Sequence, residues 1–238
     1  FYSEEMVVDA LTKHPLCNLQ IDTDFSDLQT VLFDNGKFYV ELLHWSGSEA
    51  FAHDHNFAGV FYQVKGSSFS VSMEFKEQGN YGETLAYGNC EAVEASVLNT
   101  GDMLVVHPVH TKPHAVFHLE HPTVGLIIRT HIKERYSPQE NVLPPFLKCD
   151  SSVIDLATRK HIQFIKVLAK DDPAKLFKFY KNFISEQTLS VVIWGTFMIP
   201  DVFKSAVCLE VLRSRLEELS QHCNEIFQAI QHFYTSNT

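Results

Sequence analysis

The sequence predicts a mainly β fold, a barrel or sandwich, followed by an α-helical segment. Between about residues 28 and 132, short apolar runs are separated by glycine and proline, which is typical of many short strands joined by tight turns. Beyond residue 150 the apolar residues recur at helical spacing. The net charge changes at the same place, from −11 over residues 1–150 to +1 over residues 151–238. We therefore predict a β-barrel domain over 1–148, with a short N-terminal helix, and a helical region over 149–238.

The individual elements follow from local signals. The spacing of apolar residues predicts a helix over 3–14 that Ser3 caps, and the Asn35-Gly36 pair predicts the turn of a hairpin. In the second region, Asp172 and Pro173 mark the start of a helix, and one long helix is expected over 204–234. The remaining strands and the remaining helix are expected at 57–65, 67–75, 92–98, 103–107, 114–118, 123–132 and 154–168.

The composition excludes several classes of function. The chain has 238 residues and a net charge of −10, which argues against a general nucleic-acid-binding role. Its five cysteines are scattered and form no Cys-x-x-Cys pair, so we expect reduced thiols and a cytoplasmic location. The longest apolar run, 189–199, is too short to cross a bilayer, so no membrane partner is expected.

The histidines carry the strongest signal. Nine of the thirteen histidines lie between residues 44 and 131, and two of them form the His53-Asp54-His55 sequence. In a strand, residues i and i+2 point to the same face, so His53 and His55 are expected to project together. A third histidine from a neighbouring strand would complete a facial set, and the Gly101–His114 stretch supplies two candidates, His110 and His114. Three neutral imidazoles suit Fe(II), Ni(II), Cu or Zn.

These two segments resemble the two sequence motifs of the cupin superfamily. The first motif is His-x-His followed by the turn glycine Gly66, and the second runs from Gly101-Asp102 to Pro113-His114. The resemblance spans roughly 53–114 and implies a jelly-roll barrel, also called a double-stranded β-helix. It favours His114 over His110 as the third ligand, because Pro113-His114 matches the usual entry into the next strand. The implied metal ligands are His53, His55 and His114.

The resemblance is closest to cupins whose metal is held by three histidines. Counted back from Gly66, the position that most cupins fill with a glutamate ligand is Gly59. A glycine there is similar to thiol dioxygenases of the cysteine dioxygenase type, which use Fe(II). Those enzymes place Ser, His and Tyr at alternate positions of a later strand, where this chain has Gly125, Ile127 and Arg129. The implied metal is Fe(II), with Ni, Zn, Mn or Cu as alternatives.

Three further residues are candidates for a role in catalysis. Arg129 lies in an otherwise apolar strand, and a buried arginine requires a partner, either a substrate carboxylate or an internal acid. His118 shares strand parity with His114, and Gln63 shares parity with His55, so both could face the same interior. The competing interpretation for Arg129 is a surface arginine or an internal ion pair, and for Gln63 it is ordinary core polarity.

The leading hypothesis is therefore a non-haem Fe(II) cupin dioxygenase. Its expected partners are O2 and a small organic substrate, either a thiol or an organic acid. One alternative keeps the metal as a Lewis acid for an isomerase or lyase reaction, with His110 or His118 as the base. Another is a non-catalytic, small-molecule-binding cupin whose helical tail recognises a partner. The long helix over 204–234 allows for a homodimer.

Overall fold

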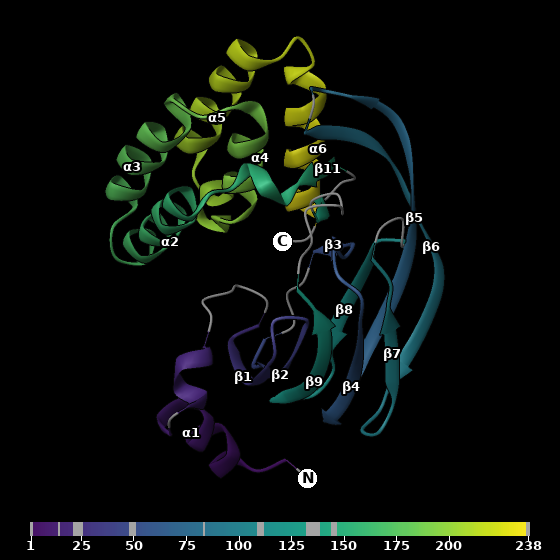
Figure 1. The fold of residues 1–238 in the computed structure, drawn as a ribbon. Coiled ribbons are helices and arrows are strands. Elements are labelled where there is room, and N and C mark those ends of the chain that lie inside the picture. The colour runs from purple at the N-terminus through teal and green to yellow at the C-terminus, as the bar shows by residue number, and fades with distance from the viewer. Residues whose placement is uncertain are drawn as a thin grey trace. The chain divides into compact units, whose positions relative to one another are not determined.

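The computed structural model describes residues 2–13, 15–20, 26–47, 51–82, 84–108, 112–131, 139–143 and 147–236, with its elements labelled in Figure 1. The chain forms two compact units. The first contains Phe1–Phe75 and Cys90–Gln139, and the second contains Lys76–Asn89 and Glu140–Thr238. The domain boundary expected after residue 148 falls within strand β11 (Leu147–Asp150) and stays a prediction.

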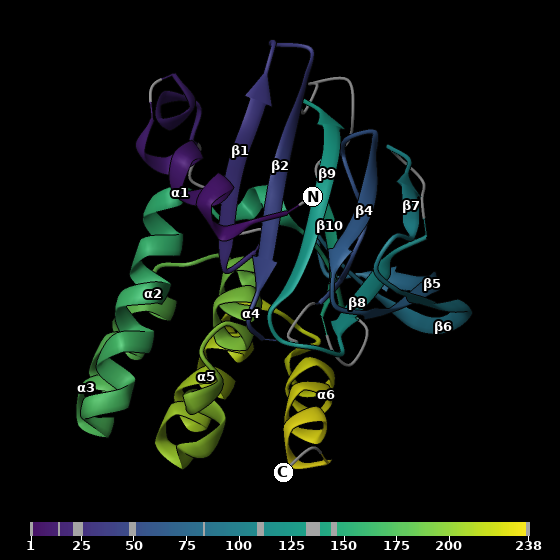
Figure 2. The ribbon, with the colours of Figure 1, turned by 90° about the horizontal axis from the view of Figure 1, so that it is seen from below.

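The first unit is built from two antiparallel sheets. In one sheet the strand order is β1-β2-β9-β4-β7, and in the other β5 and β8 lie between β6 and β3. Figure 2 shows the strands of the first sheet side by side. The strands are β1 (Leu28–Asp34), β2 (Phe38–Trp45), β3 (Ala52–His53), β4 (Gly59–Lys65), β5 (Ser68–Asn80), β6 (Leu85–Leu98), β7 (Met103–Val106), β8 (His114–His118) and β9 (Thr123–Thr130).

This strand order is that of a jelly roll. Each sheet takes strands alternately from distant parts of the sequence, so that β2-β9-β4-β7 faces β3-β8-β5-β6. The predicted fold class is confirmed: a jelly-roll β barrel is followed by an α-helical segment.

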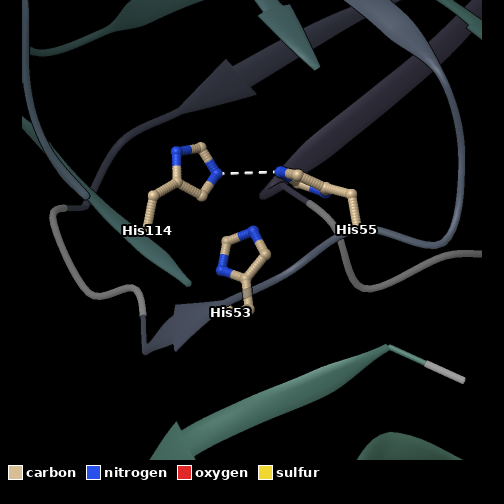
Figure 3. Close-up of side chains that lie close together, drawn as sticks. All are labelled: His53, His55 and His114. Atoms are coloured by element: carbon tan, nitrogen blue, oxygen red, sulfur yellow. Dashed lines mark hydrogen bonds between the residues drawn. The ribbon is translucent and has the colours of Figure 1, made fainter. Parts of the chain in front are cut away.

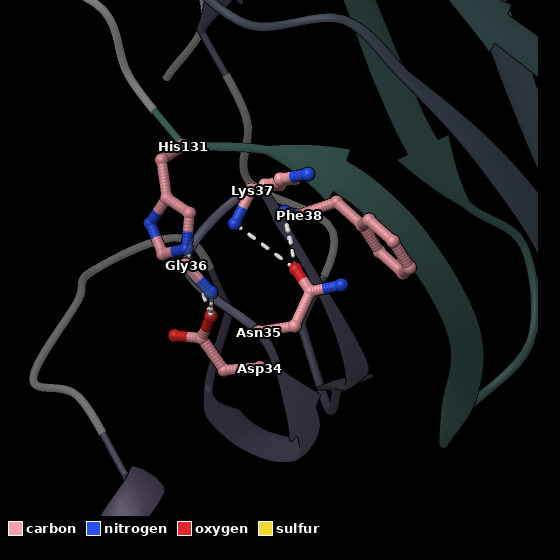
Figure 4. Close-up of polar contacts among 6 residues, drawn as sticks. All are labelled: Asp34, Asn35, Gly36, Lys37, Phe38 and His131. Carbon is pink, nitrogen blue, oxygen red and sulfur yellow. Dashed lines mark hydrogen bonds and ion pairs between the residues drawn. The ribbon is translucent and has the colours of Figure 1, made fainter.

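The predicted hairpin between β1 and β2 is confirmed in detail. The N–H of Gly36 donates to Oδ1 of Asp34 at 2.7 Å, and the N–H groups of Lys37 and Phe38 donate to Oδ1 of Asn35 (Figure 4). Gly36 has φ +77°, which side chains other than glycine rarely adopt. Asp34 also accepts from Nε2 of His131 at 2.9 Å, which ties the turn to the end of β9.

An apolar cluster lies in the barrel interior on the side of the first sheet. Leu43, Phe57, Val106 and Ile127 are almost fully buried there, and Trp45 packs against them. At roughly 1.5–3 kcal/mol for each fully buried large side chain, this cluster is a major source of stability for the barrel. Helix α1 (Glu4–Thr12) covers the outer face of the same sheet, and the predicted Ser3 cap is confirmed by its contact with the N–H of Met6.

The second unit combines one end of a hairpin with the helices. Its part of β6 pairs with β11, which pairs with β10 (Glu140–Leu143). Strands β10 and β11 are not among the elements expected from the sequence. The helices are α2 (Leu156–Asp171), α3 (Pro173–Ser185), α4 (Leu189–Phe197), α5 (Ala206–Leu219) and α6 (Cys223–Ser236), with 3-10 turns η1 (Leu16–Leu19) in the first unit and η2 (Ser151–Val153) and η3 (Pro200–Lys204) in the second. Within the described ranges, no helix has both the length and the apolar character needed to cross a membrane.

One expectation about the helices is wrong. The single helix expected over 204–234 is divided into α5 and α6. Ser220 ends α5 in an extended conformation, with φ −150° and ψ 135°, and its N–H bonds to the carbonyl of Leu216. The apolar positions continue across the break, so hydrophobic spacing alone did not reveal it. The predicted start at Asp172 and Pro173 is confirmed, because Asp172 caps α3.

Candidate metal centre

The structure brings His53, His55 and His114 together at one end of the jelly roll. One nitrogen of each ring lies within 4.8 Å of the others, and this is the one such group of three or more His, Cys, Asp or Glu residues found in the described parts of the chain. Figure 3 shows the three rings converging on a common point. Nε2 of His55 and Nε2 of His114 are 2.8 Å apart.

Strand pairing explains how residues so far apart in sequence meet. His53 at the end of β3 is directly opposite His114 at the start of β8. Opposed residues in an antiparallel pair share a face, so the two side chains point together. His55 lies just beyond β3, and its ring is 4.9 Å from each of the other two rings. His110, the alternative third ligand, lies outside the described residues.

All three imidazoles are held neutral. Burial lowers the pKa of His53 and of His55, and it lowers the pKa of His114 to about 4. The neighbouring histidines lower the pKa of His55 and His114 further, because a second positive charge would be repelled. Neutral imidazole is the form that binds a metal.

The donor set fits a transition metal. His53 Nδ1 lies 2.9 Å from the carbonyl oxygen of Phe51 and donates to it, so Nε2 is the unprotonated nitrogen of that ring and the one that can bind a metal. A metal with bonds of about 2.1 Å to each nitrogen separates neighbouring ligands of an octahedral set by about 3 Å. The 2.8 Å between His55 and His114 is close to that value. Imidazole donors suit Fe, Ni, Cu and Zn.

The backbone explains why no glutamate stands beside these histidines at residue 59. Gly59 in β4 lies opposite Arg129 in β9. A Cβ at residue 59 would lie 2.7 Å from the carbonyl oxygen of Ile128 and 3.0 Å from the Cβ of Arg129. Because backbone would have to move to admit any side chain, this position cannot supply a fourth ligand.

Gly59→Ala is expected to lower the free energy of unfolding by about 1–3 kcal/mol, because the added methyl group forces the two strands apart. Urea denaturation measures this effect. Gly47→Ala is the matched control, because nothing lies within 4 Å of a Cβ there, and its effect should stay within about 0.5 kcal/mol. Equal stability of the two variants would contradict the close approach of β4 and β9.

Arg129 has an internal acidic partner. Its Nε lies 2.6 Å from a carboxylate oxygen of Glu41, a residue with no exposed surface, and Gln29 donates to the same carboxylate. The guanidinium also stacks over the rings of Tyr39 and Phe57, with its carbon 4.9 Å and 4.6 Å from their centres. Its charge lowers the pKa of His55, so Arg129 acts electrostatically on the metal centre.

Sequence reasoning did not identify Glu41. A signal was available, because Glu41 is the single charged residue among the apolar residues of β2 and has the parity of Tyr39 and Leu43, which are both buried. Burial raises the pKa of this carboxyl, and the Arg129 guanidinium opposes that rise. A catalytic role for Arg129 stays a prediction.

The other two candidates lie together, in a polar group that is separate from the three histidines. Ser68 donates to Oε1 of Gln63 at 3.1 Å and accepts from Nδ1 of His118 at 3.0 Å. The His118 ring stacks on Trp45, with centroids 4.3 Å apart. Among the described residues, no interaction joins His118 or Gln63 to the metal centre, and their catalytic roles stay predictions.

The neutral, buried His118 makes the first unit less stable in acid. Burial lowers the pKa of His118 from 6.5 to about 4. Between these values the unfolded chain binds a proton that the folded chain does not, so the free energy of unfolding falls as the pH falls from 6.5 to 4.

In the metal-free protein, His118→Asn should therefore lose less stability than the wild type between pH 7 and pH 5. Urea unfolding at the two pH values measures the difference, with the exposed His107→Asn as control. If His118→Asn and the wild type lose equal stability over this range, His118 does not titrate as argued.

Gly125, Ile127 and Arg129, at the positions where thiol dioxygenases have Ser, His and Tyr, make structural contacts in this chain. A Cβ at Gly125 would lie 2.2 Å from the ring of Phe61, so that position is closed. Ile127 belongs to the apolar core, and Arg129 pairs with Glu41. These three described residues therefore cannot form the Ser-His-Tyr proton relay of the thiol dioxygenases.

Comparison with known proteins gives similarities at the level of structure. No protein-family model and no curated protein matches the chain. Similar solved structures include the DMSP lyase DddQ from Ruegeria pomeroyi DSS-3, at 14% identity and a TM-score of 0.33, with 50% of this chain and 54% of that chain covered. The alignment thus spans about half the length of that lyase.

Two further structures are similar over slightly less of this chain. Hydroquinone 1,2-dioxygenase from Sphingomonas sp. TTNP3 matches at 12% identity and a TM-score of 0.35, covering 45% of this chain and 68% of that one. A cupin superfamily protein from Desulfitobacterium hafniense DCB-2 matches at 16% identity and a TM-score of 0.30, covering 49% and 87%. The fold assignment for this chain rests on its own strand order.

Proposed function

We propose that the chain is a cupin of the three-histidine type that binds Fe(II) and acts as a dioxygenase on a small organic substrate. One observation carries the proposal. The neutral imidazoles of His53, His55 and His114 have nitrogens within 4.8 Å of one another, and this described group contains no carboxylate. His53, His55 and His114 would hold the metal. When bound, a metal with this ligand set keeps its full charge, retains open positions and supplies redox chemistry with O2.

The surrounding residues prepare the centre for that chemistry. The carbonyl of Phe51 fixes the orientation of His53, and the ring of Phe57 lies 4.8 Å from the ring of His55. An apolar wall of this kind keeps water away from reacting groups. A divalent metal held by three neutral imidazoles would favour an anionic ligand, which is compatible with a thiolate or an organic acid.

The alternative without O2 requires a base beside the metal. His118 is bonded to Ser68 and stacked on Trp45, and His110 lies outside the described residues. His118 is therefore not placed as a base for the metal centre, and we propose the dioxygenase first. A cytoplasmic location and a homodimer stay predictions.

Metal analysis of the purified protein, combined with an oxygen electrode, tests the proposal. The expected result is one equivalent of iron per chain and O2 consumption with one member of a panel of thiols and small organic acids. Turnover of a substrate in the absence of O2 would favour the isomerase or lyase reaction. A protein that holds no metal and binds none when metal is added would overturn the proposal.

A further inference from the structure

Three serines of β5 lie on the same face of the sheet as the two histidines of β8. The register pairs Ser72 with His114 and Ser68 with His118, with Ser70 between them. Opposed residues of an antiparallel pair share a face, so these serines point into the same interior as the two histidines. The sheet that faces them presents the apolar Leu43 and Ile127, together with the buried Gln63 that bonds to Ser68.

The pairing places the Ser72 hydroxyl beside the metal centre. The N–H of Met73 bonds to the carbonyl of Pro113, so the next pair along, Ser72 and His114, is of the type without backbone bonds. Side chains in such pairs approach most closely, with Cα atoms about 4.5 Å apart. His53 is opposite His114 on the other side of β8. His53, His114 and Ser72 therefore form one row across the sheet.

At the other end of β5 and β8, a serine that is paired with a histidine in the same way forms a side-chain hydrogen bond with it. Ser68 and His118 are paired as Ser72 and His114 are, and their side chains bond at 3.0 Å. Within the described residues, by contrast, Ser72 is half-buried and makes no side-chain hydrogen bond. Its hydroxyl is thus a donor that is available at the metal centre.

The charge of the centre indicates what this donor would meet. Three neutral imidazoles leave the charge of a divalent metal uncompensated, so an anion is the favoured additional ligand. We propose that Ser72 donates a hydrogen bond to an anionic oxygen or nitrogen donor, such as a carboxylate, bound at the three-histidine centre. This inference rests on the proposed metal site and adds a residue that selects its ligand.

The test uses the Co(II)-loaded protein and azide as the probe anion. Azide binding is followed by the visible spectrum of the cobalt, and cobalt affinity is measured separately. In Ser72→Ala the dissociation constant of azide should rise about tenfold, the effect of losing one hydrogen bond to a charged acceptor. Cobalt should still bind at one equivalent with unchanged affinity.

Two variants serve as controls. Ser70→Ala makes the same change on the same face two residues away and should leave azide binding unchanged. Ser72→Thr keeps the hydroxyl and should retain azide affinity within about threefold, a loss of less than one hydrogen bond. If Ser72→Ala alters cobalt affinity instead of azide affinity, the hydroxyl orients His114 and the proposal is wrong. Equal azide affinity in wild type and Ser72→Ala also overturns it, whereas a wild type that takes up no cobalt refutes the metal site itself.

Discussion

Replacing His55 by alanine is expected to abolish stoichiometric metal binding, from one equivalent per chain to less than about 0.1. His55 is the most enclosed of the three ligands, with 7% of its surface exposed, and its Nε2 lies 2.8 Å from that of His114. The variant would leave only two imidazoles, those of His53 and His114, to bind the metal. Even residues that only support metal ligands change affinity 10- to 100-fold, so the loss of a ligand should exceed that range.

The measurement combines elemental analysis with thermal unfolding. At a free metal concentration 1,000 times its dissociation constant, binding stabilises the wild type by about 4 kcal/mol. This stabilisation should vanish in His55→Ala and equally in His53→Ala and His114→Ala. His107→Ala is the control, because His107 is exposed and lies outside the cluster, and it should bind metal like the wild type. A full metal equivalent in the double variant His53→Ala, His55→Ala would refute the site.

The same experiment decides between His110 and His114. If His114 is the third ligand, His110→Ala retains the metal and His114→Ala loses it. The opposite result would assign the ligand to His110 and would leave His114 as a neighbour of the site. The pairing of His114 with His53 supports the first result.

The cluster of three histidines could be predicted because its signals are local. The alternation of side chains along a strand brings His53 and His55 to one side, and Pro113-His114 marks where the next strand begins. His118 and Gln63 are both buried, but they lie in a separate polar group with Ser68. The alternation of side chains predicts which face a residue is on, but not how far along the strand it lies. The separation of His118 and Gln63 from the three histidines could therefore not be predicted.

The partners across the sheets could not be predicted in the same way. Glu41 and Arg129 are 88 positions apart, and they meet because β2 and β9 pair in a jelly roll. The crowding at Gly59 likewise depends on β9 passing beside β4. The break at Ser220 and the strand β10 lack a hydrophobic pattern that would distinguish them from the surrounding sequence.

Replacing Glu41 by leucine is expected to cost about 3–5 kcal/mol of unfolding free energy, one of the largest effects available in this chain. The substitution leaves the Arg129 guanidinium buried without its carboxylate, and an uncompensated buried charge is strongly destabilising. Urea denaturation followed by circular dichroism measures the loss.

Arg129→Met should be destabilising in a way that depends on pH. Burial already raises the pKa of Glu41 above 4.5, and the guanidinium that opposes this rise is then missing. Between 4.5 and the raised value, the folded state binds a proton that the unfolded state does not. The free energy of unfolding should therefore fall as the pH rises through that range, so the destabilisation by Arg129→Met should be smallest at or below pH 4.5 and larger at neutral pH.

The double variant Glu41→Leu, Arg129→Met separates the ion pair from the packing of its members. Removing both charges removes two desolvation costs together, so the double variant should be more stable than Glu41→Leu alone. If the two single losses simply add, the carboxylate and the guanidinium do not interact in the folded protein. Metal content provides a second readout, because Arg129 lowers the pKa of His55. Without that charge, protons should compete more effectively for His55, and the pH at which half the metal is lost should move upward.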